Sequence, residues 1–194
     1  MNLILASASP RRREILASLG VPFTVITADA DETCDLSDPG SRVETIATRK
    51  CRAVLEAIRG TEHDRPDTLI LAADTLVTLD GDFLGKPRDA SDARRMIACL
   101  QGRTHYVASG ICLSYGGRTV SSHELTGVHV APMSDAEIDA YIQTGESFGK
   151  AGAYAIQGAA ARYITGIEGD YFNVVGLPVH CLYRTLRMAF GISL

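Results

Sequence analysis

The chain has 194 residues, of which 46% are hydrophobic and 22% are charged, and its formal net charge at pH 7 is −4. A chain of this length and hydrophobic content can bury one sizeable core but is too polar for a membrane protein. The net negative charge argues against a protein that binds a nucleic-acid polymer through bulk electrostatic attraction. The five cysteines are scattered and form no Cys-x-x-Cys pair, which indicates reduced thiols rather than a disulfide framework or a zinc site.

The first six residues lack both the positive start and the apolar run of a signal peptide. No other stretch approaches the roughly 20 apolar residues of a membrane span. We therefore expect a cytoplasmic protein without a membrane partner.

Strands and helices alternate along the chain without repeats or a long linker, which predicts a single α/β domain over residues 1–194. The first predicted elements are strand 3–6, a helix between Ser9 and Gly20 with Ile15, Leu16 and Leu19 on its inner face, strand 23–28 and helix 41–59. They are followed by paired strands over 68–79 that lead to a turn at Asp80-Gly81, helix 90–100, and a hairpin of strands 104–115 and 118–130 around Gly116-Gly117. A helix from a capping box at Ser134 to about Gly145 and a helix begun by Pro178 complete the prediction.

A charged residue interrupts one of the most apolar stretches. Asp74 lies between the apolar residues 69–73 and the apolar pair Leu76-Val77. A carboxylate in such a strand must be paired, hydrogen-bonded or bound to a metal, because leaving it buried alone costs too much free energy. Asp74 is therefore the first candidate for a catalytic residue.

Three arginines occupy the first turn of the N-terminal helix. Arg11, Arg12 and Arg13 repel one another and the positive end of the helix dipole. A bound phosphate would remove this conflict, because anions are stabilised at a helix N-terminus and arginine matches phosphate oxygens. The alternative is that the three long side chains extend into water.

Two lysines pose the same choice. Lys50 lies in an otherwise apolar helical row with Val43, Ala47 and Val54, so it either extends from the edge of the core or lines a cleft. Lys86, between Gly85 and Pro87, either presents its ammonium group to a phosphate or is simply solvated.

The acidic residues Asp31 and Glu32 could accompany Asp74. Magnesium or manganese prefers oxygen ligands and often takes only one or two carboxylates together with water and substrate phosphates, so Glu32 with Asp74 would suffice. The five histidines show no metal-ligand spacing, and the glycine and lysine spacings match neither a P-loop nor a dinucleotide-binding fingerprint. Histidine catalysis and those two nucleotide-binding folds are therefore not predicted.

Five segments together resemble the Maf (septum formation inhibitor) family of nucleoside triphosphate pyrophosphatases. They are Leu5-Ala6-Ser7-Ala8-Ser9-Pro10-Arg11-Arg12, Ala72-Ala73-Asp74-Thr75, Leu84-Gly85-Lys86-Pro87, residues 150–158 (Lys-Ala-Gly-Ala-Tyr-Ala-Ile-Gln-Gly) and Val174-Val175-Gly176-Leu177-Pro178. The resemblance implies an elongated mixed-sheet α/β fold similar to inosine triphosphate pyrophosphatase, with two lobes around a cleft. It also implies dependence on a divalent cation (Mg, Mn or Co) and assigns Asp74 as the proton acceptor.

The segment at residues 150–158 resembles the branch of that family that acts on dTTP and UTP. In that branch, the positions of Arg11, Thr75 and Gln157 are linked to substrate choice, and those of Ser7, Arg12, Glu32, Lys50 and Lys86 match other pocket positions. The resemblance thus implies a small nucleotide as partner, no nucleic-acid polymer, and hydrolysis to the monophosphate and pyrophosphate.

A preference for uracil and thymine over cytosine requires that the Gln157 amide be held in one orientation, for example by Thr75. Two alternatives stay open at this stage: a nucleotide-sensing protein that restrains septum formation, and an enzyme that removes modified nucleotides. The sequence does not distinguish a monomer from a homodimer.

Overall fold

The computed structural model describes residues 1–193, and its chain divides into two compact units. The first unit consists of Met1–Asp74, Ser109–Glu124 and the segment that begins at Gly176. The second consists of Thr75–Ala108 and Leu125–Val175. In residues 1–193 no helix is long and apolar enough to cross a membrane.

The strands form one mixed sheet in the order β2-β1-β3-β5-β6-β7, and β4 pairs with β3. Their bounds are β1 Asn2–Leu5, β2 Thr24–Val25, β3 Thr68–Leu79, β4 Asp82–Leu84, β5 Thr104–Tyr115, β6 Arg118–Val130 and β7 Ile164–Glu168. The strand β1 runs parallel to β2 and β3, whereas β4 is antiparallel to β3 and β7 is antiparallel to β6. The mixed sheet and the α/β class agree with the prediction from sequence.

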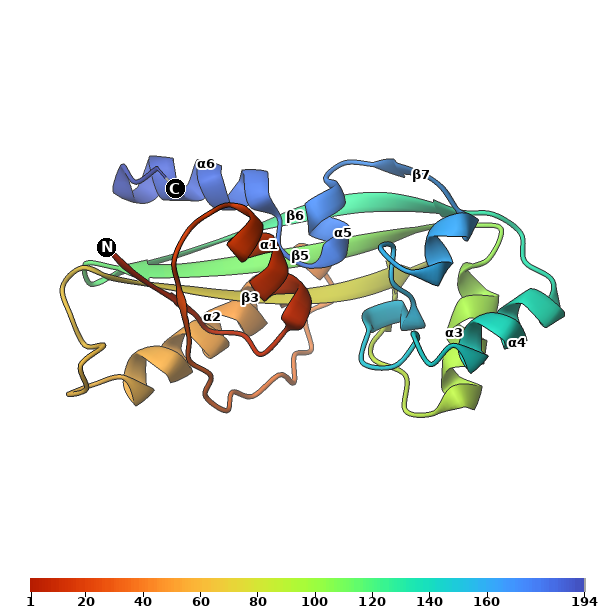
Figure 1. The fold of residues 1–194 in the computed structure, drawn as a ribbon, viewed down its shortest axis with the longest axis horizontal. Helices are drawn as coiled ribbons and strands as arrows, with labels where there is room; N and C mark the ends of the chain where they lie inside the picture. Colours follow the sequence, from red (N-terminus) through yellow and green to blue (C-terminus); the bar gives the residue numbers. More distant parts are fainter. Residues whose placement is uncertain (194) are drawn as a thin grey trace. The chain divides into compact units, whose positions relative to one another are not determined.

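The helices are α1 Pro10–Ser18, α2 Pro39–Ala57, α3 Ala90–Leu100, α4 Asp135–Gln143, α5 Tyr171–Val175 and α6 Val179–Phe190, with short 3₁₀ helices η1 Ala151–Ala153 and η2 Ala159–Tyr163. In the first unit, α2 and α6 lie on opposite faces of the sheet (Figure 1).

The core of the first unit lies between α2 and the strands β1 and β3. Apolar side chains at α2 positions 47, 51 and 54, and that of the C-cap residue Ile58, pack against Ile4 and Ile70. The approach of α2 to β5 is so close that a Cβ atom on Gly110 would lie 2.6 Å from the Val43 carbonyl carbon. This packing fixes α2 on the sheet, and with it the direction of the side chains on its inner face.

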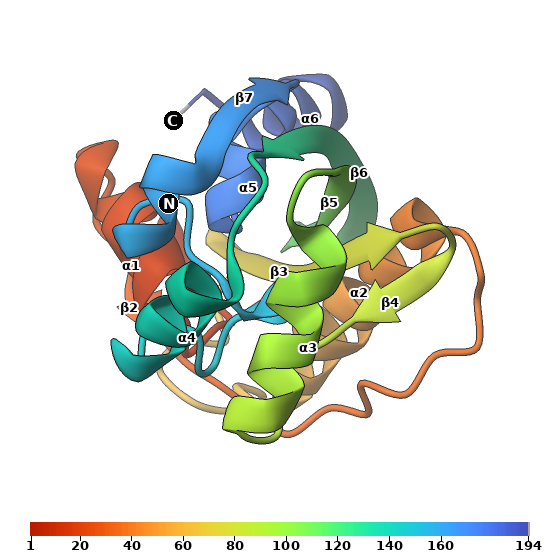
Figure 2. The same cartoon turned by 90° about the vertical axis from the view of Figure 1, so that its right-hand side faces the viewer.

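The core of the second unit lies between the helices α3 and α4 and the strands β5 and β6. Figure 2 shows α3 and α4 side by side. Buried residues from α3, such as Met96 and Leu100, pack with Ile138 and Tyr141 of α4 and with Val107 and Val128 of the sheet. Helix α4 begins with the predicted capping box, in which Ser134 and Glu137 each accept a hydrogen bond from the other's main chain.

Most long elements lie where the sequence predicts them. The bounds of α3, β5 and β6 match the predicted ranges, and the β5–β6 turn is at the two glycines. Residues 68–79 form the single strand β3 instead of the predicted paired strands, and the partner of its last residues is β4, after the predicted turn. The second helix begins two residues earlier than predicted because Asp38 caps it and Pro39 occupies its first position.

Two further local predictions are wrong. The strand predicted over 23–28 contains only Thr24 and Val25, which pair with Ile4 and Leu5 at the end of β1. Leu19 is not on the inner face of α1, since it is the C-cap residue and is 38% exposed, whereas Ile15 and Leu16 are buried.

Candidate active site

The strand β3 places Asp74 at the end of its first buried run. Its carboxylate Oδ1 lies 2.7 Å from the ammonium nitrogen Nζ of Lys50, and the two side chains are only 14% and 18% exposed. Lys50 projects from α2 toward the strand, in agreement with the apolar helical row in which it lies. The second carboxylate at this ammonium is that of Glu32, whose Oε1 is 3.0 Å from Nζ. Lys50 therefore holds two carboxylates together.

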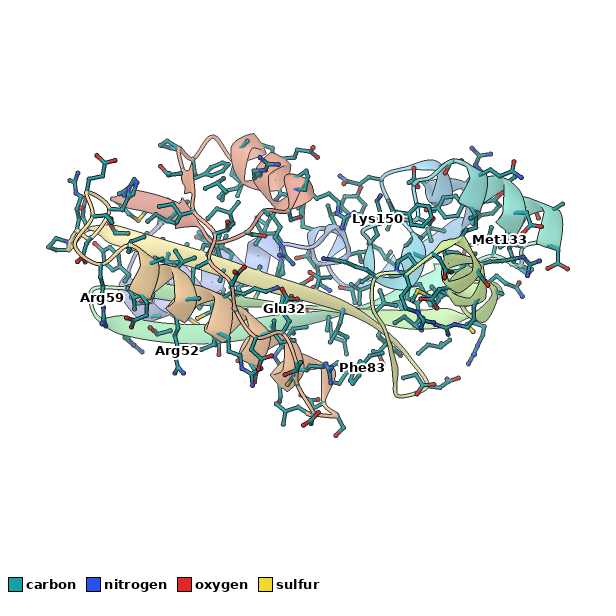
Figure 3. The ribbon with its side chains drawn as sticks, turned by 90° about the horizontal axis from the view of Figure 1, so that it is seen from below. Glu32, Arg52, Arg59, Phe83, Met133 and Lys150 are labelled. Atoms are coloured by element: carbon teal, nitrogen blue, oxygen red, sulfur yellow. The ribbon has the colours of Figure 1, made fainter. Side chains whose placement is uncertain are left out.

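Glu32, and not its neighbour Asp31, accompanies Asp74. Figure 3 labels Glu32 on the long segment that runs between β2 and α2. The Asp31 side chain is 62% exposed and pairs with Arg49 instead. Hydrogen bonds from Thr33 lower the pKa of Asp31. Asp31 thus belongs to a surface ion pair that stabilises the loop.

Arg12 is buried and ties three segments together. Its Nε donates to the carbonyl of Gly176 at 2.8 Å, and its Nη1 donates to the Ala73 carbonyl at 2.8 Å and to Ser7 Oγ at 3.0 Å. Burial lowers the pKa of Arg12, and the charges of Asp74 and Glu32 oppose that effect. The guanidinium thereby fixes the main chain immediately before Asp74.

The other two arginines of this turn have different surroundings. Arg13 is exposed, as expected for a solvated charge, whereas Arg11 is half-buried and burial lowers its pKa. The N-cap residue Ser9 makes no capping hydrogen bond with its side chain. Instead its N–H donates to Ser7 Oγ at 3.3 Å, so Ser7 links the start of α1 to the Arg12 guanidinium. Extension into water thus describes Arg13 but is wrong for Arg12.

The second unit holds the remaining predicted site residues. Thr75 follows Asp74 on β3 and is half-buried, and Lys86 is exposed in the segment after β4. The Gly85 carbonyl accepts a hydrogen bond from Gly152 N–H at 3.1 Å, which joins the Gly-Lys-Pro segment to the segment at residues 150–158. These two predicted motifs therefore lie side by side within this unit.

Gln157 is exposed on the loop between η1 and η2. Its side-chain amide has no hydrogen-bond partner among residues 1–193, and a fixed orientation of this amide by Thr75 stays a prediction. The main chain of this loop is instead bonded to Tyr141 and Glu146. No sequence pattern marks these two residues, because their partners are main-chain N–H groups more than ten positions away.

The carboxylates at Lys50 are the candidate ligands for a divalent cation. In the part of the chain that the structure describes, no group of three or more His, Cys, Asp or Glu side chains gathers as a metal cage. Glu32 and Asp74 converge on one point, and each has a second carboxylate oxygen with no protein partner within residues 1–193. Two carboxylates of this kind fit a hard cation such as Mg²⁺ that keeps water and phosphate oxygens as its other ligands.

Comparisons with known proteins agree with the resemblance. The family model described as "Maf-like protein" matches residues 2–189. A dTTP/UTP pyrophosphatase of Symbiobacterium thermophilum is 47% identical over 188 residues, which cover 96% of this chain and 92% of the relative. A dTTP/UTP pyrophosphatase of Salinibacter ruber is 48% identical over 193 residues, covering 97% and 91%. One from Thermococcus onnurineus is 42% identical over 190 residues, covering 98% and 99%.

Among solved structures, the Ham1 protein of Staphylococcus aureus matches with a TM-score of 0.47 and 16% identity, covering 68% of this chain and 72% of that chain. The family match spans nearly the whole sequence, and the relatives share more than 40% identity over more than nine-tenths of both chains. The chain belongs to the Maf-like protein family.

Proposed function

We propose that this protein is a pyrophosphatase that hydrolyses dTTP and UTP to the monophosphate and pyrophosphate. The observation that carries the proposal is the partly buried carboxylate of Asp74, held by Lys50 beside Glu32, in a chain 42–48% identical to dTTP/UTP pyrophosphatases. A protein that only binds a nucleotide has no need of a carboxylate prepared to accept a proton.

Asp74 acts as the proton acceptor for the attacking water. Lys50 occupies its Oδ1, which leaves Oδ2 to accept a hydrogen bond from a water molecule directed at the α-phosphorus. Because α2 and β3 are both fixed by core packing, the carboxylate needs little reorganisation when the water binds.

Glu32 and Asp74 would hold a divalent cation, Mg²⁺, Mn²⁺ or Co²⁺. When bound, such an ion neutralises phosphate charge and makes a water molecule more acidic. The residues of the chain contribute the two carboxylates and their spacing. Loss of activity in excess chelator, with recovery on adding one of the three ions, is the expected result.

Cationic and hydroxyl groups bind the triphosphate. We assign this role to Ser7, Arg11, Arg12, Lys50 and Lys86. Positive side chains beside the phosphates stabilise the negative charge that develops on the leaving pyrophosphate. No covalent intermediate is needed, in keeping with a mechanism based on positioning and electrostatics.

Thr75 and Gln157 select the base. Uracil and thymine present a carbonyl oxygen beside a ring N–H, and the glutamine amide can pair with both, whereas cytosine presents the reversed pattern. The whole of residues 1–194 acts as a single catalytic domain in the cytoplasm, as a monomer or homodimer, and modified pyrimidine nucleotides are further potential substrates.

Product analysis tests the reaction. Purified protein is incubated with UTP, dTTP, CTP, ATP and GTP plus Mg²⁺, Mn²⁺ or Co²⁺, and the products are separated by ion-exchange chromatography. UMP and dTMP with equimolar pyrophosphate are expected. Release of UDP and orthophosphate would mean that the attacked phosphorus is wrong, and equal catalytic efficiency on CTP and UTP would reject the base preference.

A further inference from the structure

The loop that carries Gln157 is held at both ends by one hydrogen-bonded network in the second unit. On the near side, the Ala155 N–H donates to the hydroxyl oxygen of Tyr141 at 3.3 Å. On the far side, the Ala159 and Ala160 N–H groups donate to the Glu146 carboxylate at 2.8 and 3.4 Å. The Tyr141 hydroxyl donates to the same carboxylate at 3.0 Å. The network therefore brackets Gln157 on both sides.

The chemistry of this network requires a charged acceptor at position 146. The Ala159 and Ala160 amides open the 3₁₀ helix η2, whose first N–H groups have no partner inside the helix. A carboxylate can accept all three hydrogen bonds at once, and such charge-assisted bonds are the stronger ones. Burial and the Glu146 charge raise the pKa of Tyr141, so its hydroxyl stays protonated and serves as acceptor and donor together.

The network is anchored on a rigid part of the unit. Tyr141 is a buried residue of α4, which packs against α3 (Figure 2). The main chain of Glu146 is fixed as well, because its N–H donates to Thr144 Oγ1 and its carbonyl accepts from the ammonium group of Lys150, labelled in Figure 3.

The glycine that follows Gln157 allows the carboxylate to approach. A Cβ atom on Gly158 would lie 2.0 Å from Glu146 Oε2, so any other residue at position 158 would require the Glu146 carboxylate to move away. Gly158 has a negative φ of −113°, so the close approach of the carboxylate, and not a left-handed backbone, is the reason for glycine here. The carboxylate and the loop are thus built to fit each other.

We propose that Glu146, with Tyr141, is a positioning residue that sets the base selectivity of the enzyme by fixing the main chain on both sides of Gln157. This inference rests on the proposed function, in which Gln157 reads the pyrimidine. The Gln157 amide has no hydrogen bond of its own within residues 1–193, so its location depends on the main chain that carries it.

The test compares UTP with CTP as substrates of the full-length protein, with pyrophosphate release as the readout. The wild type, Glu146→Ala, Glu146→Gln, Tyr141→Phe and Gln157→Ala are measured for kcat and KM on both nucleotides. Glu168→Ala is the matched control, because that carboxylate belongs to the same unit but is 76% exposed and pairs with the His129 ring instead of the loop. Melting temperatures show that each variant is folded.

We expect Glu146→Ala to lower the UTP-to-CTP ratio of kcat/KM by about 5- to 150-fold, the cost of mismatching a buried hydrogen-bonding group, mainly through a higher KM for UTP. Glu146→Gln retains the volume and one acceptor oxygen and should keep part of the ratio, as should Tyr141→Phe. Glu146→Ala combined with Gln157→Ala should have the same ratio as Gln157→Ala alone, because both act through one contact.

The outcomes separate the two proposals. A wild type without preference for UTP overturns the proposed base preference and this inference together. A preference that falls in Gln157→Ala but is unchanged in every Glu146 and Tyr141 variant overturns this inference alone. A loss of activity that is equal on both nucleotides would assign Glu146 to folding only. If Glu146→Ala fails to fold, Glu146→Gln and Tyr141→Phe decide the question.

Discussion

Replacing Asp74 with asparagine should stop hydrolysis while leaving the fold intact. Asparagine has the same shape as aspartate, and its carbonyl oxygen can still accept the hydrogen bond that Lys50 donates at 2.7 Å. Lys50 also keeps Glu32 at 3.0 Å, so its ammonium group is not left without a carboxylate. The change therefore removes the proton acceptor and one of the two carboxylates proposed to hold the cation, while the packing around the side chain is retained.

The expected effect of Asp74→Asn on kcat is large, whereas its expected effect on the free energy of unfolding is small. A positioned general base contributes typically about 10²- to 10⁴-fold to the rate, so kcat for UTP should fall by that factor. Hydrogen bonds to charged partners are worth about 1 kcal/mol more than neutral ones, so the free energy of unfolding should fall by only about 1 kcal/mol.

The assay is steady-state release of pyrophosphate from UTP, paired with urea denaturation of each variant. Asp31→Asn is the matched control, because Asp31 lies beside Glu32 in the sequence but pairs with Arg49 at the surface and should keep near wild-type kcat. A kcat for Asp74→Asn within tenfold of the wild type would refute the assignment of Asp74 as proton acceptor.

Three further predictions concern metal, phosphate binding and pH. Excess EDTA should abolish pyrophosphate release, and added Mg²⁺, Mn²⁺ or Co²⁺ should restore it; unchanged turnover in chelator would exclude a role for the ion. Arg12→Ala and Lys86→Ala should each lower kcat/KM on the order of a hundredfold. Only Arg12→Ala should also lower the unfolding free energy, by more than about 2 kcal/mol, because Arg12 is buried and Lys86 is exposed; equal urea midpoints would contradict this difference. Burial lowers the pKa of His105 to about 4, whereas histidine in the unfolded chain has a pKa near 6.5. When the pH falls below about 6.5, the unfolded chain therefore takes up a proton that the folded chain does not. Between pH 7 and 5, this effect should lower the free energy of unfolding of the wild type by about 2 kcal/mol and should be absent in His105→Gln. An identical change of unfolding free energy with pH in the two proteins would refute it.

The long elements are predictable because their signals are local. Residues 68–79 and 104–130 read as strands from apolar composition and turn glycines, and the capping box at Ser134 marks the start of α4. The stretch from Ala151 to Val175 is different. It folds as two 3₁₀ helices, the short β7 and the five-residue α5, and segments this short show no hydrophobic period. Their conformation depends on tertiary contacts, such as the Glu146 carboxylate at the start of η2.

Some residues of the candidate site could likewise be predicted from the sequence, and others could not. Asp74 and Lys50 are visible in the sequence because each puts a charge into an otherwise apolar pattern, and the structure pairs those two charges. The choice of Glu32 over Asp31 is not visible, because adjacent acidic residues in a loop have no period that tells which one faces inward. The burial of Arg12 is equally hidden, since its carbonyl partners at Ala73 and Gly176 lie 61 and 164 positions away.

The charges of the first unit explain why the proposed reaction should need a metal ion. Arg12 and Lys50 bring two positive charges to the neighbourhood of Glu32 and Asp74, which bring two negative charges, so these four side chains together have no net formal charge. A triphosphate adds several negative charges, and close like charges in a partly buried site repel strongly. Arg11 contributes one further positive charge at the start of α1. A divalent cation on the two carboxylates would supply two more, which is the charge that the side chains of this unit do not provide.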